Sequence, residues 1–508
     1  MTDTMTAPSN TSEGKQTLVK DVTLESFYKV MRIGAVEDNG FKPMISQDFL
    51  PLNEELSDQS RFISALGALV WNIDRDGDRL DRGRIQDLIS QIDLMINDQI
   101  NEVIHHEKFQ QLESIWRSLF GLISSTNFRS NIMIDILDVS KSELQDDFEN
   151  NSVDFTGSPL FQKIYSNEYE QYGGKPFGAI IGMYEFEHTP RDEFWLKMIG
   201  KIANASHAPF ISSVSPKFFG CDTMEELASI KDLEGLMNHP KYGSFNQLRD
   251  SEEAAYLGLC LPRYILRLPW HPEANPCGLF NFSEYTWGND NKMYLWGNPA
   301  ILFAKNLIRS FEEAGWCQYI RGPKGGGLIS GLPIHTFNIC GEKEVKTPTE
   351  MLIPDYRELE FANSGFIPLI YRKGTSDVCF FSAQSLKRPK KFLDPKDSEN
   401  AQLACNLPYT FSITRIAHYV KSIMRDNIGS ASNAAYIQDK LNKWIMKYVT
   451  TTANPDDQTL RFYPFKAAKV EVTERPGKIG WFHSSISVLP HIQMEGVSVE
   501  LRLESRLG

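Results

Sequence analysis

The chain has 508 residues, of which 41% are hydrophobic and 23% are charged, and its formal net charge is −12. This length predicts roughly two to four domains, and the composition is that of a globular protein with enough apolar residues for sizeable cores. The acidic balance argues against a nucleic-acid-binding protein that neutralises phosphates broadly, because such a protein needs clustered Lys and Arg.

The seven cysteines have no CxxC spacing, and their number is odd. This pattern favours free thiols in a reducing compartment over a disulfide framework or a zinc site. The chain also lacks a basic-then-apolar start and an apolar run of about 18 residues, which argues against a signal peptide and a membrane span. We therefore expect a cytoplasmic protein without membrane insertion.

The N-terminal region changes from polar to helical along its length. The first 16 residues are rich in Ser, Thr and Asn and predict a disordered tail, and residues 17–60 predict an extended arm. Apolar residues then recur at spacings of three and four from Ile85 to Val103 and from Phe109 to Leu122, which predicts two helices. We expect three regions: a tail and arm over 1–60, a main α/β region over 61–380, and a C-terminal region over 381–508.

The middle of the chain alternates apolar runs with helical patterns. Ile132–Val139, Phe177–Phe186 and Ala208–Val214 predict buried strands, and Phe194–Ala205 predicts a helix between them. This alternation indicates α/β architecture with a partly parallel sheet. Pro299–Ala314 predicts a further helix that Gly315 ends as a C-terminal cap.

The C-terminal region predicts two helices followed by strands. The helices cover Pro408–Arg425 and Ala434–Val449, and alternating residues follow in Lys469–Thr473 and Ser484–Val488. The stretch from Gly496 to Glu504 alternates strictly, as a half-buried strand does. A strand at a chain end can add to the sheet of another chain through main-chain hydrogen bonds, or it can form an internal hairpin edge; both interpretations remain open from the residues alone.

Motifs that carry chemistry are missing or incomplete. Gly325-Gly326-Gly327 follows Lys324 without a P-loop pattern, and the chain has no H-E-x-x-H and no G-x-S-x-G. The Asp74-x-Asp76-Gly77-Asp78 run has its glycine at the fourth position, whereas a calcium-binding EF-hand loop needs it at the sixth. We therefore expect no catalytic residue, no metal site and no cofactor, although an enzyme with an unrecognised site stays open.

An ordered set of short motifs resembles the large subunit of the contractile sheath of bacterial type VI secretion systems, which is related to phage-tail sheath proteins. The motifs run in the family's order from about residue 60 onward and include Leu112–Leu119, Gly173–Gly178, Tyr184–Phe186, Ala205–Phe210, Tyr256–Arg263, Leu295–Asn298, Gly365–Leu369, Arg415–Tyr419 and Pro490–Gln493. Each motif alone is weak, whereas the ordered set is specific. Met183 and Ser118 depart from the family's usual Asp and Gly, which suggests a divergent branch.

The resemblance implies a non-enzymatic structural subunit and a multi-domain α/β (mixed α+β) sheath-like fold, with mixed sheets flanked by helices. It implies an obligate heterodimer with a small sheath subunit, and a helical lattice of further copies around an inner tube of hexameric rings. A baseplate and a disassembly ATPase are the family's other partners. Contraction of the lattice would propel the inner tube. The alternative is an α/β binding protein that acts as a small oligomer.

The resemblance also assigns roles to residues near the C-terminus. Those expected to pack an interlocking sheet between subunits are Val470, Val472, Val497, Val499, Leu501 and Leu503. Arg415, Lys421 and Arg425 lie on one predicted helix and are candidates for contact with the inner tube; a solvated helix face is the alternative interpretation.

Overall fold

The computed structural model describes residues 82–278, 281–286, 290–339, 341–390, 392–429, 433–452, 454–474, 481–491 and 493. These residues belong to two compact units, one within 82–104 and 271–284 and the other within 105–270 and 285–493. The predicted tail and arm over 1–60 and the predicted terminal strand over 496–504 lie outside the described residues.

The first unit contains one long helix, α3 (Arg82–Ile104), which confirms the helix predicted from the apolar spacing. Two buried amides fix the 271–284 segment to it. Ser283 donates its backbone N–H to Asn97 Oδ1 at 2.8 Å, and Asn101 Nδ2 donates to the Ser283 carbonyl at 3.1 Å. Hydrogen bonding of this kind offsets the cost of burying the amides.

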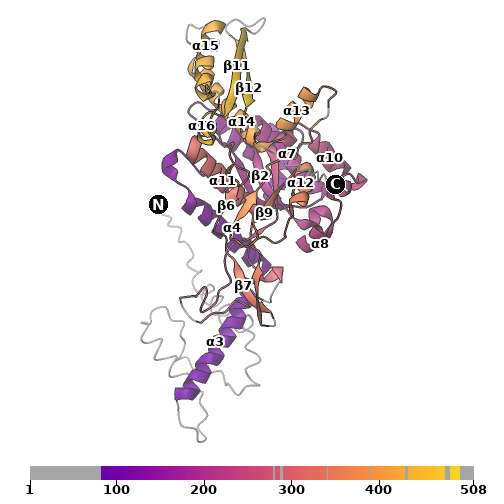
Figure 1. Ribbon diagram of the computed structural model, residues 1–508, viewed down its shortest axis with the longest axis vertical. Helices are drawn as coiled ribbons and strands as arrows, with labels where there is room; N and C mark the ends of the chain where they lie inside the picture. The colour runs from indigo at the N-terminus through magenta and orange to yellow at the C-terminus, as the bar shows by residue number, and fades with distance from the viewer. Residues whose placement is uncertain are drawn as a thin grey trace, which may run out of the picture. The chain divides into compact units, whose positions relative to one another are not determined.

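A six-stranded mixed sheet organises the second unit (Figure 1). Its order is β1 (Ile180–Phe186), β2 (Phe210–Val214), β3 (Leu257–Leu261), β9 (Phe366–Tyr371), β10 (Val378–Phe380) and β6 (Leu328–Ile329). The first four strands are parallel, and β10 runs antiparallel to both β9 and β6. The prediction of a partly parallel sheet is confirmed.

The two faces of the sheet belong to different apolar cores, because side chains alternate along each strand. On β3, Leu257, Leu259 and Leu261 enter one core, and Cys260 enters the other. Phe210 and Ile211 divide in the same way on β2. Parallel strands that are buried on both faces therefore tend to have continuous apolar runs in their sequence.

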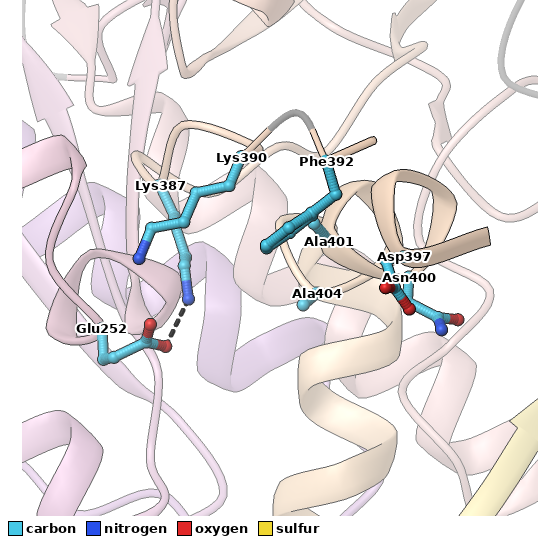
Figure 2. Close-up of a pocket in the computed structure, with 8 residues that line it drawn as sticks. All are labelled: Glu252, Lys387, Lys390, Phe392, Asp397, Asn400, Ala401 and Ala404. Atoms are coloured by element: carbon cyan, nitrogen blue, oxygen red, sulfur yellow. Dashed lines mark hydrogen bonds and ion pairs between the residues drawn. The ribbon is translucent and has the colours of Figure 1, made fainter. Parts of the chain in front are cut away.

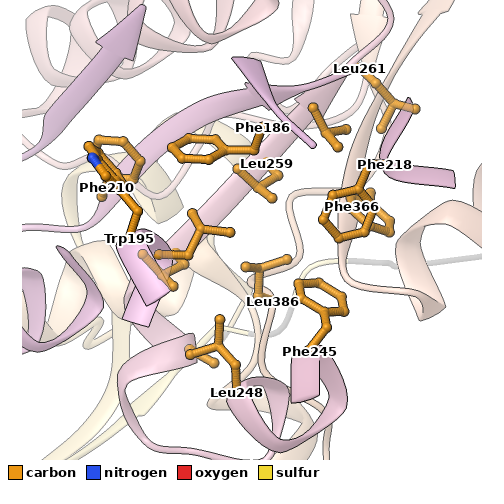
Figure 3. Packing of buried hydrophobic residues seen from close by; sticks show 14 of the residues in the cluster. Phe186, Trp195, Phe210, Phe218, Phe245, Leu248, Leu259, Leu261, Phe366 and Leu386 are labelled. Carbon is orange, nitrogen blue, oxygen red and sulfur yellow. The ribbon is translucent and has the colours of Figure 1, made fainter. Parts of the chain in front are cut away.

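Helices cover both faces. Trp195 on α7 (Pro190–Ser206) packs against Phe210 and Phe186 on the first face, where α10 (Gly243–Arg249) and α12 (Asp355–Asn363) also contribute residues (Figure 3). The opposite face is covered by α11 (Pro299–Ala314) and by the N-terminal half of α14 (Leu407–Asp426). The result is a three-layer arrangement with helices on each side of the sheet.

Local signals explain where α11 begins and ends. Asn298 accepts a hydrogen bond from the Ala300 N–H as N-cap, and Pro299 occupies the first turn. Gly315 follows in the left-handed conformation at φ 74°, which glycine adopts without strain. The predicted bounds, Pro299–Ala314, are confirmed.

The remaining elements surround the sheet or lie beyond its edges. Those before β3 are α4 (Glu107–Ser125), η3 (Phe128–Ser130), α5 (Lys141–Asn150), η4 (Phe155–Gly157), α6 (Pro159–Phe161), η5 (Gln162–Tyr169), η6 (Pro216–Phe219), α8 (Met224–Ser229), α9 (Leu233–Met237), η7 (Pro240–Tyr242) and η8 (Glu253–Tyr256). Those after it are β4 (Tyr264–Ile265), η9 (Asn291–Met293), β5 (Trp296–Gly297), β7 (His335–Ile339), β8 (Glu342–Lys346), α13 (Pro395–Leu403), α15 (Ala434–Ile445), η10 (Met446–Tyr448), α16 (Asp457–Phe462), β11 (Phe465–Glu474) and β12 (Phe482–Pro490).

One predicted strand is wrong, and one begins later than expected. Residues 132–139 form neither a helix nor a strand and pair with no described strand, and Met133 and Ile136 are exposed. An apolar run alone does not supply the ladder partner that makes a strand. In the run predicted from Phe177, the strand starts at Ile180, where pairing with Phe210 begins.

No helix in the described ranges combines the length and the apolar character that crossing a membrane requires.

Candidate assembly interfaces

The strands β11 and β12 form a separate two-stranded antiparallel sheet with α15 beside it (Figure 1). Val470 lies opposite Ile486, and Val472 lies opposite Ser484. Along both strands inward residues alternate with exposed ones, so the sheet has one covered face and one exposed face. This confirms the alternation predicted for Lys469–Thr473 and Ser484–Val488.

The covered face packs on helices of the same chain. Val470 and Val472 are 4% and 8% exposed and share a core with α14, α15 and Trp316. Their side chains therefore complete an intrachain core in this structure. The other four residues expected to pack the interlocking sheet, Val497, Val499, Leu501 and Leu503, lie outside the described residues.

Within the part of the chain that the structure describes, other segments meet β11 at its start and near its end. Among the described residues, the sheet consists of β11 and β12 alone. The outer edge of β11 meets Val449 at an isolated bridge beside Phe465, and the Val472 N–H donates to Gln438 Oε1 at 3.4 Å. A two-stranded ribbon needs further strands or packing against a helix for stability, and α14 and α15 supply that packing here. Its strand edges could still take up further strands.

Polar contacts fix the chain where it leaves β12. His491 donates its backbone N–H to the Pro464 carbonyl at 3.1 Å, and its own carbonyl accepts from Gln318 Nε2 at 3.3 Å. Two residues later, the Gln493 N–H donates to Tyr409 Oη at 3.1 Å. The Pro490–Gln493 motif therefore anchors the start of the C-terminal segment to α14 and to the loop after α11.

The three cations proposed for inner-tube contact lie on α14, and each interacts within the chain. Lys421 Nζ lies 2.6 Å from Glu170 Oε1, and Arg425 donates to backbone carbonyls after η5. The Arg415 guanidinium lies over the Phe311 ring, 4.6 Å from its centroid. The structure thus shows intrachain partners for all three side chains.

Burial and hydrogen bonding shift the pKa values of groups around α14. Hydrogen bonds from Lys421 and Tyr165 lower the pKa of Glu170, which stays ionised. Burial lowers the pKa of His418 to about 4, against the smaller opposing effect of its hydrogen bond to the Ser206 carbonyl. His418 is therefore a neutral structural histidine at neutral pH.

A further apolar surface lies on α4. One side of this helix packs on α11 through Leu122, which contacts a cluster that includes Ile301 and Ala304. The other side exposes large apolar groups, with Trp116 64% and Phe120 73% exposed. The full set of exposed apolar residues on α4 is Phe109, Leu112, Ile115, Trp116, Phe120 and Ile123. An exposed apolar stripe of this size indicates a protein interaction surface.

Sequence reasoning did not identify the α4 stripe, although the helix itself was predicted. The signal was present in the residues, because Leu112, Trp116 and Phe120 are spaced four apart and share one side of the helix. The buried side carries smaller groups, such as Ser114 and Ser118, where the helix approaches its neighbours. Large apolar groups on a helix predict a core face by default, so only the structure shows that they remain uncovered.

Comparisons with known proteins point to one family over most of the chain. The EvpB/VC_A0108 tail sheath N-terminal domain matches residues 86–387, and the tail sheath gpW/gp25-like domain of the same family matches residues 396–507. The type VI secretion system sheath protein TssC1 of Pseudomonas aeruginosa is 41% identical over 426 residues, which cover 83% of this chain and 86% of that protein. This chain belongs to the tail sheath family. It is a structural subunit of a contractile type VI secretion sheath, and the alternative of a small-oligomer binding protein is not favoured.

Two solved structures give distant likenesses. One is the baseplate of the anti-feeding prophage, at 11% identity and a TM-score of 0.37, covering 74% of this chain and 84% of that one. The other is the contracted sheath complex of an extracellular contractile injection system, at 10% identity and a TM-score of 0.34, covering 61% and 68%.

A surface pocket of about 380 Å³ lies where the two tail sheath domains join (Figure 2). Lys387 in its wall forms an ion pair with Glu252, and Phe392 lies above Ala401 of α13. Charges of both signs line it, and they do not converge on one point as the polar groups of a ligand site do. Within the described ranges, no group of three or more His, Cys, Asp or Glu residues is placed to hold a metal ion.

Proposed function

We propose that this sheath subunit polymerises with a smaller sheath subunit into a helical tube around an inner tube of protein rings, and that shortening of the lattice drives the inner tube outward. Assembly takes place in the cytoplasm, on a baseplate, and a disassembly ATPase recycles the contracted sheath. The observation that carries the proposal is the β11–β12 sheet, two-stranded among the described residues, in a chain of the tail sheath family.

Strand addition is the proposed link between subunits. The C-terminal segment of one chain, with Val497, Val499, Leu501 and Leu503 on one side of its alternating sequence, would add to the β11–β12 sheet of a neighbour. Main-chain hydrogen bonds would provide the affinity, and the alternating side chains would set the register. Val470 and Val472 stabilise this sheet, because they pack its covered face onto α15.

The α4 stripe is the proposed contact with the smaller sheath subunit. Trp116 and Phe120 would be the central contacts, since large aromatic groups supply much of the binding energy at protein interfaces. Covering this stripe also removes an aggregation hazard, which supports an obligate partner rather than an occasional one.

Contact with the inner tube through α14 remains a proposal. Arg415, Lys421 and Arg425 place positive charge on one helix, which suits an acidic partner surface. Their intrachain partners compete with such a contact. If binding to the inner tube is unchanged after charge reversal at Lys421 and Arg425, this role is wrong.

The first experiment is co-expression of the chain with a small sheath subunit, followed by negative-stain electron microscopy of the lysate. We expect abundant hollow tubes from the wild-type chain and none after deletion of residues 496–508. Tubes that persist after the deletion would contradict strand addition by the C-terminal segment but not the sheath assembly. A heterodimer or monomer without tubes under any condition would contradict polymerisation.

A further inference from the structure

Helix α14 connects two apolar cores. Its first turns bury Leu407 and Phe411 in the core on one face of the central sheet. Its later turns place Ile416, Val420 and Ile423 in the core formed with α15, the β11–β12 sheet and Trp316, which follows α11. A single helix therefore links the central sheet to the sheet that is proposed to exchange strands.

Three buried hydroxyl side chains lie on α14 around Phe411. The hydroxyls of Thr410, Ser412 and Thr414 all hydrogen-bond back to carbonyls of the same helix or its N-cap, at 3.2, 3.0 and 3.0 Å. Such back-bonding weakens the regular ladder and often bends helices. Three of these bonds lie within five residues of α14.

Beyond this region, Arg425 binds the end of the π-helix η5. Its guanidinium donates to the carbonyls of Tyr169, Glu170 and Gln171, at 3.0, 3.1 and 2.8 Å. The last carbonyls of a helix lack intrahelical partners and carry negative partial charge, so a cation is stabilised there.

Two further residues of α14 extend this contact. Lys421 pairs with Glu170 at 2.6 Å and lies 3.6 Å from the centroid of the Tyr169 ring. One turn earlier, His418 Nε2 lies 3.0 Å from the Ser206 carbonyl in the last turn of α7. We call this set of contacts the clasp: His418, Lys421 and Arg425 on α14, with Tyr169, Glu170, Gln171 and Ser206.

The clasp differs physically from the cores on either side of it. Its outer part is polar, because the side chains of Lys421 and Glu170 are 25% and 48% exposed, whereas Tyr169 and Ser206 are buried. Ion pairs with this exposure are weak and reform readily in water. The Lys421–Glu170 pair can therefore open without separating the Leu407–Phe411 core or the Ile416–Ile423 core.

We propose that the clasp is a releasable latch: it holds the later half of α14 against η5 and α7, and it opens locally while both apolar cores stay packed. The later half of α14 packs on the β11–β12 sheet, so opening of the latch would weaken the support of the strands that are proposed to meet neighbouring subunits. That consequence rests on the proposed function, whereas the latch itself does not.

Hydrogen–deuterium exchange on the full-length chain tests the latch with a charge-reversal cycle. We expect Lys421→Glu and Glu170→Lys each to raise exchange about fivefold at the amides of residues 421–426, since an exposed ion pair contributes at most about this factor. The double variant restores the opposite charges and should return exchange toward wild type. Exchange in β3 and β11 should not change, and Ser422→Glu, an exposed position on the same helix, is the matched control.

Three results would overturn the latch. They are unchanged exchange in both single variants, no recovery in the double variant, or an equal rise of exchange in β11. The last result would mean that the clasp opens only when the core opens. Arg425→Lys keeps the positive charge but loses the planar guanidinium that donates to several carbonyls, so it should raise exchange at residues 421–426 by a smaller factor. This variant replaces a charge-reversal variant that does not fold. Absence of tubes from wild-type co-expression would count against the proposed function alone, because exchange still decides the latch.

Discussion

Gly258 shows how one residue permits the close packing of two layers. A Cβ at this position would lie 2.7 Å from Ile211 Cδ1, 2.9 Å from Leu407 Cδ1 and 3.0 Å from Ile367 Cδ1. Glycine in the middle of a buried strand is otherwise unfavourable, because it adds no packing and costs backbone entropy. Here it lets α14 approach the sheet at Leu407.

We therefore predict that Gly258→Ala destabilises the chain by about 1–3 kcal/mol, the usual cost of overpacking a core. The midpoint of urea unfolding measures the effect. Gly243→Ala is the matched control, because a Cβ there meets nothing within 4 Å and the residue begins a helix. An equal change in the two variants would show that packing at Gly258 is not the cause.

His418 predicts a pH dependence of stability. Its pKa is lowered from 6.5 to about 4 in the folded chain, mainly by burial, so the unfolded chain binds the proton more readily. The contribution of neutral His418 is present in full above about pH 6.5 and is lost as the pH falls toward 4.

Urea unfolding of the wild-type chain should therefore show a midpoint that declines between these pH values. His418→Gln keeps a donor for the Ser206 carbonyl but does not titrate, so its midpoint should decline less. Burial also lowers the pKa of His207, whose effect remains in both proteins and cancels in the difference. Parallel pH profiles would contradict the assignment to His418.

At the scale of elements, α4 combines a narrow buried side with a wide exposed apolar side. Substitutions at Trp116 and Phe120 should therefore weaken partner binding without affecting folding, because these side chains contribute little to the cores of the isolated chain. The same argument does not apply to Leu122, which is buried against α11.

We predict that Trp116→Glu combined with Phe120→Glu reduces co-purification of the small sheath subunit by at least about tenfold, as loss of central aromatic contacts does at interfaces. Circular dichroism should show unchanged helix content. Gln111→Lys, a change at an exposed polar position of the same helix, should leave co-purification intact. Retention of the partner by the double variant would place its contact elsewhere.

The elements also show which local sequence signals are sufficient to predict a helix or a strand. The caps of α11 and the apolar period of α3 are local, and both were predicted from the residues. The short strands β4, β5 and β6 have two residues each and carry no period that a sequence pattern could reveal. The run 132–139 has strand-like composition without a partner strand, and pairing is a property of the fold rather than of the run.

At the scale of the whole molecule, the assembly proposal depends on which side of the C-terminal segment carries apolar groups. Val499 and Leu501 share one side of the alternating sequence, and Ser498 belongs to the other. Val499→Asp should abolish tubes in co-expression, because a charge would be buried in the shared sheet. Ser498→Asp should leave tubes abundant. Equal effects of the two substitutions, counted by electron microscopy, would contradict a strand with one buried face.

The sequence by itself determined the class of fold, the position of the long helices and, through its ordered motifs, the sheath family. These follow from periodicity, capping residues and short motifs in a fixed order, none of which depends on distant contacts. Only the tertiary structure decided that Lys421 and Arg425 meet the end of η5, some 250 positions earlier in the chain, and that Trp116 and Phe120 remain uncovered. The physical reason is that charge pairing and exposure depend on which surfaces folding brings together, and no local pattern encodes that choice.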